Sequence, residues 1–191
     1  MKGCSGSKEL AGLASTYECA QCYYAIEEDD RAVMAEGWQR ALTSRGNPQR
    51  PGAGAKVRLV MRQDAVSDGV SEAGVTASVL AKVLERRFDV DVVTYADAET
   101  FDWSSLPDDG RFVILASTSR VRYGANAKAT FKPHLHLALW NPYQALDFDA
   151  PALITYGFAA PALDAVDAWL SGTLEAKGHV PVPGFTSPSP Q

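Results

Sequence analysis

Phe112-Val113-Ile114-Leu115-Ala116 is the stretch that decides the fold, because it is apolar at every position. A strand with one face in water alternates between apolar and polar side chains. A strand of a parallel sheet is covered by helices on both faces, so it is apolar throughout. The stretch therefore predicts a strand in the interior of an α/β protein.

Four further segments have the composition of strands: 57–61, 90–95, 135–140 and 152–156. Helices are predicted between them. Ser71 is expected to cap a helix whose apolar side chains run to Phe88, and Pro161 to open a second helix that ends at Gly178. Strands alternating with helices imply parallel crossovers. We therefore predict an α/β fold, a three-layer sandwich with a mostly parallel five- to six-stranded sheet and helices on both faces.

The regions on either side of this pattern define the predicted domain organisation. Residues 1–30 are an appended or weakly ordered segment, 31–54 a helix and linker, 55–185 the α/β domain, and 186–191 a flexible tail. Asp29 or Asp30 is expected to cap the first helix, whose apolar stripe includes Met34 and Trp38. The prolines of 180–183 restrict that segment to an edge strand.

Charge and hydropathy exclude two classes of partner. The 191 residues include 18 Lys and Arg against 23 Asp and Glu, a formal net charge of −5, whereas a nucleic-acid binder needs a concentrated basic face. No apolar run reaches the roughly 20 residues that cross a bilayer. We therefore predict neither a nucleic-acid partner nor a membrane partner.

The cysteines, Cys4, Cys19 and Cys22, all lie near the N-terminus. An odd, clustered set is a poor disulfide framework, so a reducing, cytoplasmic location is the simplest expectation. Cys19 and Cys22 form a CxxC pair, but no strand precedes them as a redox site would require. As a zinc site they would have Cys4 as a third ligand and no histidine nearby. A redox or metal role is therefore the least favoured hypothesis, and no metal or cofactor is predicted.

Two loops follow neighbouring predicted strands, Ser117-Thr118-Ser119-Arg120 and Asn141-Pro142-Tyr143. Ligands of open α/β sheets bind at the carboxyl ends of the strands. Hydroxyl groups, a guanidinium and backbone N–H groups there suit an anion or the hydroxyls of a sugar. The ligand-binding candidates are Ser117, Ser119, Arg120, Asn141 and Tyr143, although ordinary solvated loops account for the same residues.

Other polar residues give weaker signals. His134 and His136 alternate along a strand and point to one face, but no third metal ligand is evident. Asp68 and Glu72 suit a metal or an acid, and equally a solvated loop and a first-turn helix carboxylate. Neither GxGxxG nor GxxxxGK[ST] occurs, and no nucleophile, base and orienting group can be combined. No catalytic residue is predicted.

The second half of the chain resembles a known family. The run from His136 to Tyr143, the strand Pro151–Phe158 ending in Tyr-Gly, and Gly178-His179-Val180-Pro181-Val182 follow one another in the order found in the C-terminal α/β domain of glycoside hydrolase family 3. The likeness extends over roughly residues 30–185 and is nearest to the β-N-acetylglucosaminidase branch. The helix around Trp38 would correspond to the segment leading out of the catalytic barrel.

The resemblance implies a fold without a catalytic residue. The family's nucleophilic aspartate belongs to an N-terminal barrel of roughly 200 residues or more, and far fewer residues precede the linker that ends at Gly54. The general acid–base of the acetylglucosaminidase branch also belongs to the barrel. The glutamate that serves in the glucosidase branch has no match here, so no catalytic residue is carried over.

Three hypotheses follow. The preferred one is a stand-alone or truncated C-terminal domain, structural or carbohydrate-associated and inactive alone, whose partner is a separate catalytic barrel chain or another copy. Its docking face would be an apolar patch with Trp38 and Trp103 as candidates, covered by residues 1–45 or by a second copy, although burial in the core is the commoner explanation for either tryptophan. The alternative is a sugar- or small-molecule-binding module that uses the two loops. Redox or metal function through the cysteines is the third.

Overall fold

The computed structural model describes residues 28–63 and 74–180. The chain divides into two compact units, Met1–Met34 and Ala35–Gln191, and the sheet and the site belong to the second. The strands of the sheet are β1 (Thr43–Arg45), β2 (Lys56–Arg62), β3 (Asp89–Tyr95), β4 (Phe112–Ser117), β5 (Leu135–Ala138) and β6 (Ala152–Ile154). All the strands predicted within the α/β domain's core are present.

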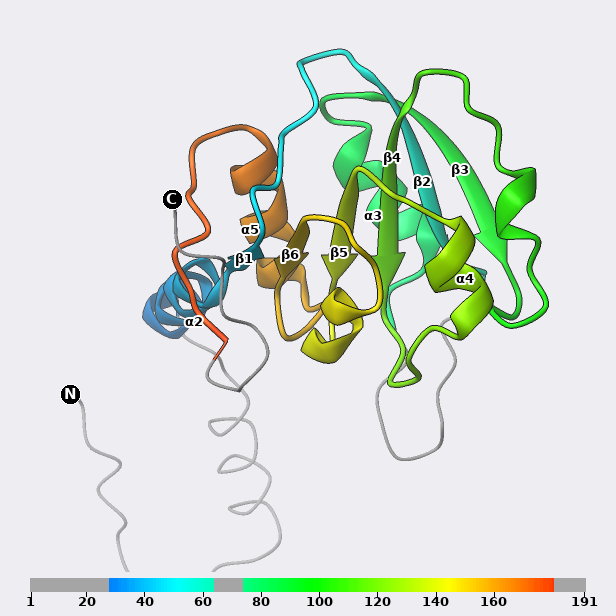
Figure 1. Ribbon diagram of the computed structural model, residues 1–191. Helices are drawn as coiled ribbons and strands as arrows, with labels where there is room; N and C mark the ends of the chain where they lie inside the picture. Colours follow the sequence, from blue (N-terminus) through cyan, green and yellow to red (C-terminus); the bar gives the residue numbers. More distant parts are fainter. Residues whose placement is uncertain (1–27, 64–73, 181–191) are drawn as a thin grey trace, which may run out of the picture. The chain divides into compact units, whose positions relative to one another are not determined.

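The sheet has six strands in the order β1-β6-β5-β4-β2-β3 (Figure 1). β2 to β6 pair in parallel with their neighbours, and β1 pairs antiparallel with β6. The stretch at 112–116 forms most of β4, between β2 and β5 in the middle of the sheet. The predicted mostly parallel sheet is confirmed.

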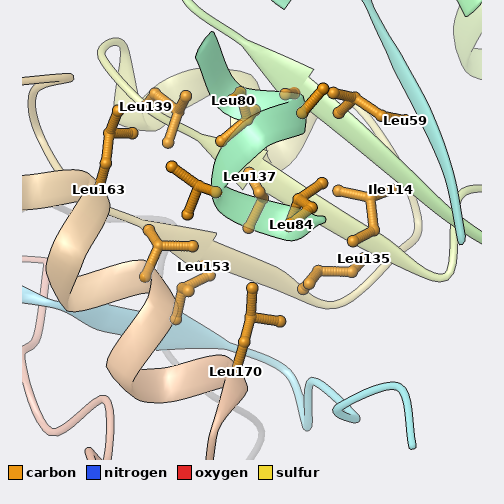
Figure 2. Packing of buried hydrophobic residues seen from close by; sticks show 14 of the residues in the cluster. Leu59, Leu80, Leu84, Ile114, Leu135, Leu137, Leu139, Leu153, Leu163 and Leu170 are labelled. Carbon is orange, nitrogen blue, oxygen red and sulfur yellow. The ribbon is translucent and has the colours of Figure 1, made fainter. Parts of the chain in front are cut away.

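Helices pack on both faces of the sheet. On one face, α3 (Ala77–Leu84) and α5 (Ala160–Leu170) cover inward-pointing strand residues such as Leu59, Ile114 and Leu137, as Figure 2 shows. On the other, the short helices η1 (Trp103–Ser105) and α4 (Ala125–Thr130) and the loops around them contact Val60 and Leu115. Adjacent residues of one strand thus enter different layers, because side chains alternate across a strand. The three-layer prediction is confirmed.

Both predicted helix boundaries are wrong. α3 begins at Ala77 with an extended Thr76 before it, so Ser71, which lies outside the described residues, is not its cap. α5 has its proline in the first turn as predicted, but it ends at Leu170 and not at Gly178. It ends there because Gly172 takes a left-handed conformation with φ 80°, and the Ser171 hydroxyl donates back to the carbonyl of Ala168.

The segment predicted as helix and linker contains the helix α2 (Glu28–Ala41) and also the edge strand β1, which the sequence did not predict. Asp29 and Asp30 lie in the first turn of α2 and not at a cap position. Beside β1, Gly178 forms an isolated parallel bridge with Thr43. Val180 is outside any strand, and the rest of the predicted edge strand, 181–183, lies outside the described residues.

Several predictions fall on segments that the structure does not describe. They concern the three cysteines, Asp68, Glu72 and the tail 186–191. Within 28–63 and 74–180, none of the helices combines the length and the apolar character that crossing a bilayer requires.

Candidate functional site

The loops after β4 and β5 meet at the carboxyl end of the sheet. The side-chain amide of Asn141 donates to the carbonyl of Arg120 at 2.9 Å, and its oxygen accepts the N–H of Tyr143 at 3.0 Å. This second bond caps η2 (Pro142–Leu146). The Gln144 amide reaches back to the Ser119 hydroxyl at 3.3 Å. The structure thus brings Ser119, Arg120 and Asn141 together, with Tyr143 exposed beside them.

Ser117 lies apart from this surface. Its side chain is buried, and its hydroxyl bonds His136 Nε2 at 2.6 Å and the Tyr123 hydroxyl at 2.9 Å. The Tyr123 hydroxyl in turn bonds that of Tyr95 at 2.8 Å. The Ser117 hydroxyl therefore belongs to an interior hydrogen-bond network below the loops.

The Ser117–His136 pair is not arranged as a nucleophile and its base. Burial lowers the pKa of His136 to about 3, so the ring is neutral. Its Nδ1 has no hydrogen-bond partner among the described residues, so the carboxylate or carbonyl that orients a catalytic imidazole is missing. His134 lies before β5 in an exposed position, where its Nδ1 accepts the N–H of Val113.

No group of three or more His, Cys, Asp or Glu side chains that suits a metal ion occurs in the part of the chain that the structure describes. The most enclosed carboxylate, that of Asp147, has a different role. Its side chain is fully buried and accepts from Arg122 Nε at 2.7 Å, from the backbone of Tyr123 at 3.0 Å, and from Lys128 Nζ at 3.0 Å. Burial alone would raise its pKa, but these donors outweigh burial and lower it. Asp147 therefore fastens the loop after β4.

An aromatic pocket of about 240 Å³ lies next to these loops. Its lining consists of Trp38, Trp140, Tyr156, Gly157, Phe158 and Ala159. Trp140 follows β5 and Phe158 follows β6, and their rings meet edge to face with centroids 5.6 Å apart. The Arg120 guanidinium carbon lies 5.1 Å from the centroid of the Trp140 ring. The side chain of Arg120, from the loop after β4, thus contacts one of the residues that line the pocket.

The backbone after β6 is shaped around this pocket. Tyr156 has φ 61°, the only non-glycine residue with positive φ in the described ranges. For a residue with a side chain, this left-handed backbone conformation raises the free energy by about 1–2 kcal/mol. Gly157 has no side chain because a Cβ there would collide with the ring of Trp38. The Tyr156 hydroxyl donates to Thr43 Oγ1 at 3.2 Å and anchors the residue from β1.

Sequence reasoning did not identify this pocket. One signal was available, since Trp140 and Phe158 each follow the end of one of two neighbouring strands. Trp38 is half-buried in the pocket wall. Trp103, the other candidate for an exposed docking face, is 2% exposed, which excludes it from such a face and agrees with the alternative of a buried tryptophan. Its ring packs among aromatic side chains, and its Nε1 donates to the carbonyl of Ala98.

Searches for a matching family model and for a matching curated protein found none. Solved structures do match. A glycoside hydrolase family 3 β-N-acetylglucosaminidase from Paenibacillus sp. str. FPU-7 has a TM-score of 0.59 and 12% identity, covering 83% of this chain and 33% of that one. This chain therefore has the fold of one part of that family 3 glycoside hydrolase. The resemblance stated from the sequence is thereby confirmed at the level of the fold.

Two further matches have the same partial character. A β-glucoside phosphorylase, BglX, has a TM-score of 0.57 and 17% identity, with 83% of this chain and 32% of that chain covered. The second is a fungal multi-domain GH3 β-N-acetylglucosaminidase with a GCN5-related glucosamine N-acetyltransferase region. It has a TM-score of 0.55 and 19% identity, and the match covers 95% of this chain and 21% of that chain. The chain therefore spans a third or less of the length of these structures.

Proposed function

We propose that this chain is a non-catalytic α/β module of the family 3 glycoside hydrolase type, structural or carbohydrate-associated, which works beside a catalytic barrel. The barrel is either another part of a longer chain or a separate partner. The proposal rests on one observation above all: the likeness covers most of this chain but only about a third of the Paenibacillus acetylglucosaminidase.

The chemistry of the pocket supports the same proposal. Glycoside hydrolysis uses two carboxyl groups, about 5–5.5 Å apart in retaining enzymes and about 6.5–9.5 Å apart in inverting ones. The lining of the aromatic pocket includes no Asp or Glu. The buried Asp147 is held by three donors, so it is not available as an acid or a nucleophile.

Hydrolysis assays test the proposal directly. The purified chain is incubated with aryl β-N-acetylglucosaminides and aryl β-glucosides, and we expect no release of the aryl group above the uncatalysed rate. Asp68→Asn and Glu72→Gln are assayed alongside, because these carboxylates lie in the segment after β2, outside the described residues. Turnover by the native chain that either substitution abolishes would overturn the proposal.

A second candidate is a self-sufficient sugar- or small-molecule-binding module that uses the loops after β4 and β5. The contact between Asn141 and Arg120 favours it, because it fixes one loop against the other. Sugars or anions should then raise the melting temperature, and Arg120→Ala should remove the shift. A module of this kind would bind ligand with full affinity when no barrel is present.

A further inference from the structure

The aromatic pocket brings four aromatic side chains together. It has three aromatic rings from residues after β5 and β6, Trp140, Tyr156 and Phe158, and a fourth, Trp38, from α2. All four residues are half-buried. Aromatic side chains supply a large apolar surface for contact with a ligand.

The strain at Tyr156 is located in the wall of this pocket. A left-handed tyrosine persists only where its surroundings hold it, and such residues cluster at binding sites. Here its hydroxyl bonds Thr43, and the Thr155 hydroxyl donates to the carbonyl of Gly157 at 2.6 Å. The chain thus maintains an unfavourable backbone conformation to place an aromatic ring at the pocket.

The polarity of the pocket defines the class of ligand. Its lining contains no charged side chain, and the guanidinium of Arg120 lies over the Trp140 ring. A volume of about 240 Å³ falls just below the roughly 300 Å³ at which pockets for drug-sized ligands begin, so it suits a single ring. A neutral ring with one apolar face and hydroxyls at its edge matches this arrangement.

We propose that the aromatic pocket binds the C–H face of one neutral pyranose residue, stacked on aromatic rings of the pocket with its hydroxyls directed towards the Arg120–Asn141 loops. The inference rests on the carbohydrate-associated part of the proposed function and adds the residues and the class of ligand. The pocket is a binding site and takes no part in bond cleavage.

Ligand-detected saturation-transfer NMR tests the proposal. The probes are N-acetylglucosamine, methyl β-glucoside and the two disaccharides chitobiose and cellobiose. We expect saturation on the axial ring hydrogens of one face. Sorbitol, which has the hydroxyls without a ring face, should show none. Equal saturation of sorbitol and the sugars would contradict stacking.

Two substitutions locate the site. Ala159→Trp fills the pocket from an exposed position that the core does not need, and Trp140→Ala removes one wall. Trp140→Ala should weaken binding by roughly two- to tenfold, since an aromatic contact contributes about 0.5–1.5 kcal/mol. Ala159→Trp should weaken binding at least as much, because the new ring occupies the pocket. Arg86→Ala, at the opposite end of the sheet, is the control and should leave the affinity unchanged.

The outcomes separate this inference from the proposed function. If a sugar binds equally well to the native chain and to folded Ala159→Trp, the aromatic pocket is not the binding site. The chain would then bind carbohydrate elsewhere, and the carbohydrate-associated function would still hold. If no sugar in the panel binds, the inference is overturned, while the hydrolysis assays still decide whether the module is non-catalytic.

Discussion

The two ends of the sheet each have a cavity, and the cavities differ in chemistry. At the carboxyl end lies the aromatic pocket. At the amino end lies a larger one of about 490 Å³, whose lining includes Arg50, Arg86 and Arg87. By volume and charge alone, the amino end is the more obvious ligand site, with an anion as its ligand.

The arginines of the amino end already have partners within the protein. Arg87 forms a bidentate pair with Asp167, at 2.8 and 3.2 Å. Arg50 donates to the carbonyl of Trp169 at 2.7 Å and to Glu175 at 2.8 Å. The C-terminal ends of α3 and α5 lie here as well, and the negative ends of their helix dipoles favour cations. These charges stabilise the fold.

The lining of the aromatic pocket at the carboxyl end differs, because it contains no charged side chain. Its four aromatic residues are half-buried, and its backbone carries strain at Tyr156. Cavity size and charge therefore do not identify a ligand site by themselves, because the charged groups that line a cavity can already be paired within the fold.

The largest effect we predict concerns the anchor of the carboxyl end. Asp147→Asn replaces a fully buried carboxylate held by Arg122, Lys128 and the backbone of Tyr123. The side chains of Arg122 and Lys128 are 44% and 39% exposed, so the substitution leaves no buried cation behind. The loss is that of hydrogen bonds to charged groups, which contribute about 1.5–3 kcal/mol, so urea unfolding should show a loss of about 2–3 kcal/mol. Asp164→Asn, whose side chain is 70% exposed, should change stability by less than about 0.5 kcal/mol. Equal effects at the two positions would contradict the proposed role of Asp147.

The second prediction concerns pH and the network beneath the carboxyl end. The pKa of His136 is about 3 in the fold and about 6.5 in an unfolded chain, so the unfolded chain takes up a proton first as the pH falls. Stability is complete above about pH 6.5 and should fall by about 2 kcal/mol between pH 7 and pH 5. The lowered pKa of Asp147 acts at lower pH, because the stability it gives is lost only below the ordinary carboxyl pKa of about 3.9.

His136→Phe provides the control for this pH dependence. It removes the titrating ring, while the hydroxyls of Ser117 and Tyr123 can still bond each other. Chemical unfolding at several pH values should show a much flatter profile between pH 7 and pH 5. A profile as steep as that of the native chain would assign the pH dependence to other groups.

The sequence predicted the sheet well because parallel strands are apolar on both faces, and β4 is the clearest case. β1 was missed for the opposite reason. Its residues, Thr43-Ser44-Arg45, have no apolar pattern, and the strand exists because it pairs with β6, more than 100 positions away. The end of α5 depended on the left-handed Gly172, a local conformation that an apolar stripe does not reveal.

The sequence could predict those parts of the candidate site whose positions follow from the order of the strands in the sheet. β4 and β5 are neighbours, so the loops carrying Arg120 and Asn141 had to meet. Ser117 was expected in the loop after β4, but it is the last residue of that strand, and its side chain points into the interior. The pocket needed two facts that no local pattern contains: that Trp38 lies beside Gly157, and that Tyr156 is left-handed.

A third prediction returns to the amino end and has a smaller effect. Arg87→Ala should lower stability by less than Asp147→Asn does, because its pair with Asp167 is partly exposed and water weakens it. Arg86→Ala is the matched control, since its pairs with Asp164 and Asp167 are longer and its side chain is 53% exposed. Thermal unfolding compares them, and a larger loss in the Arg86 variant would show that the assignment of partners is wrong.

The smallest effect predicted is none at all. Inorganic phosphate at millimolar concentration should leave the melting temperature unchanged beyond its general salt effect, which sulfate and chloride at equal ionic strength define. The reason is that Arg50 and Arg87 are paired with carboxylates, so an anion entering the amino-end cavity would compete with groups already in place. A phosphate-specific rise that saturates and disappears in Arg86→Ala would make the amino end a ligand site, and the contrast between the two ends would no longer hold.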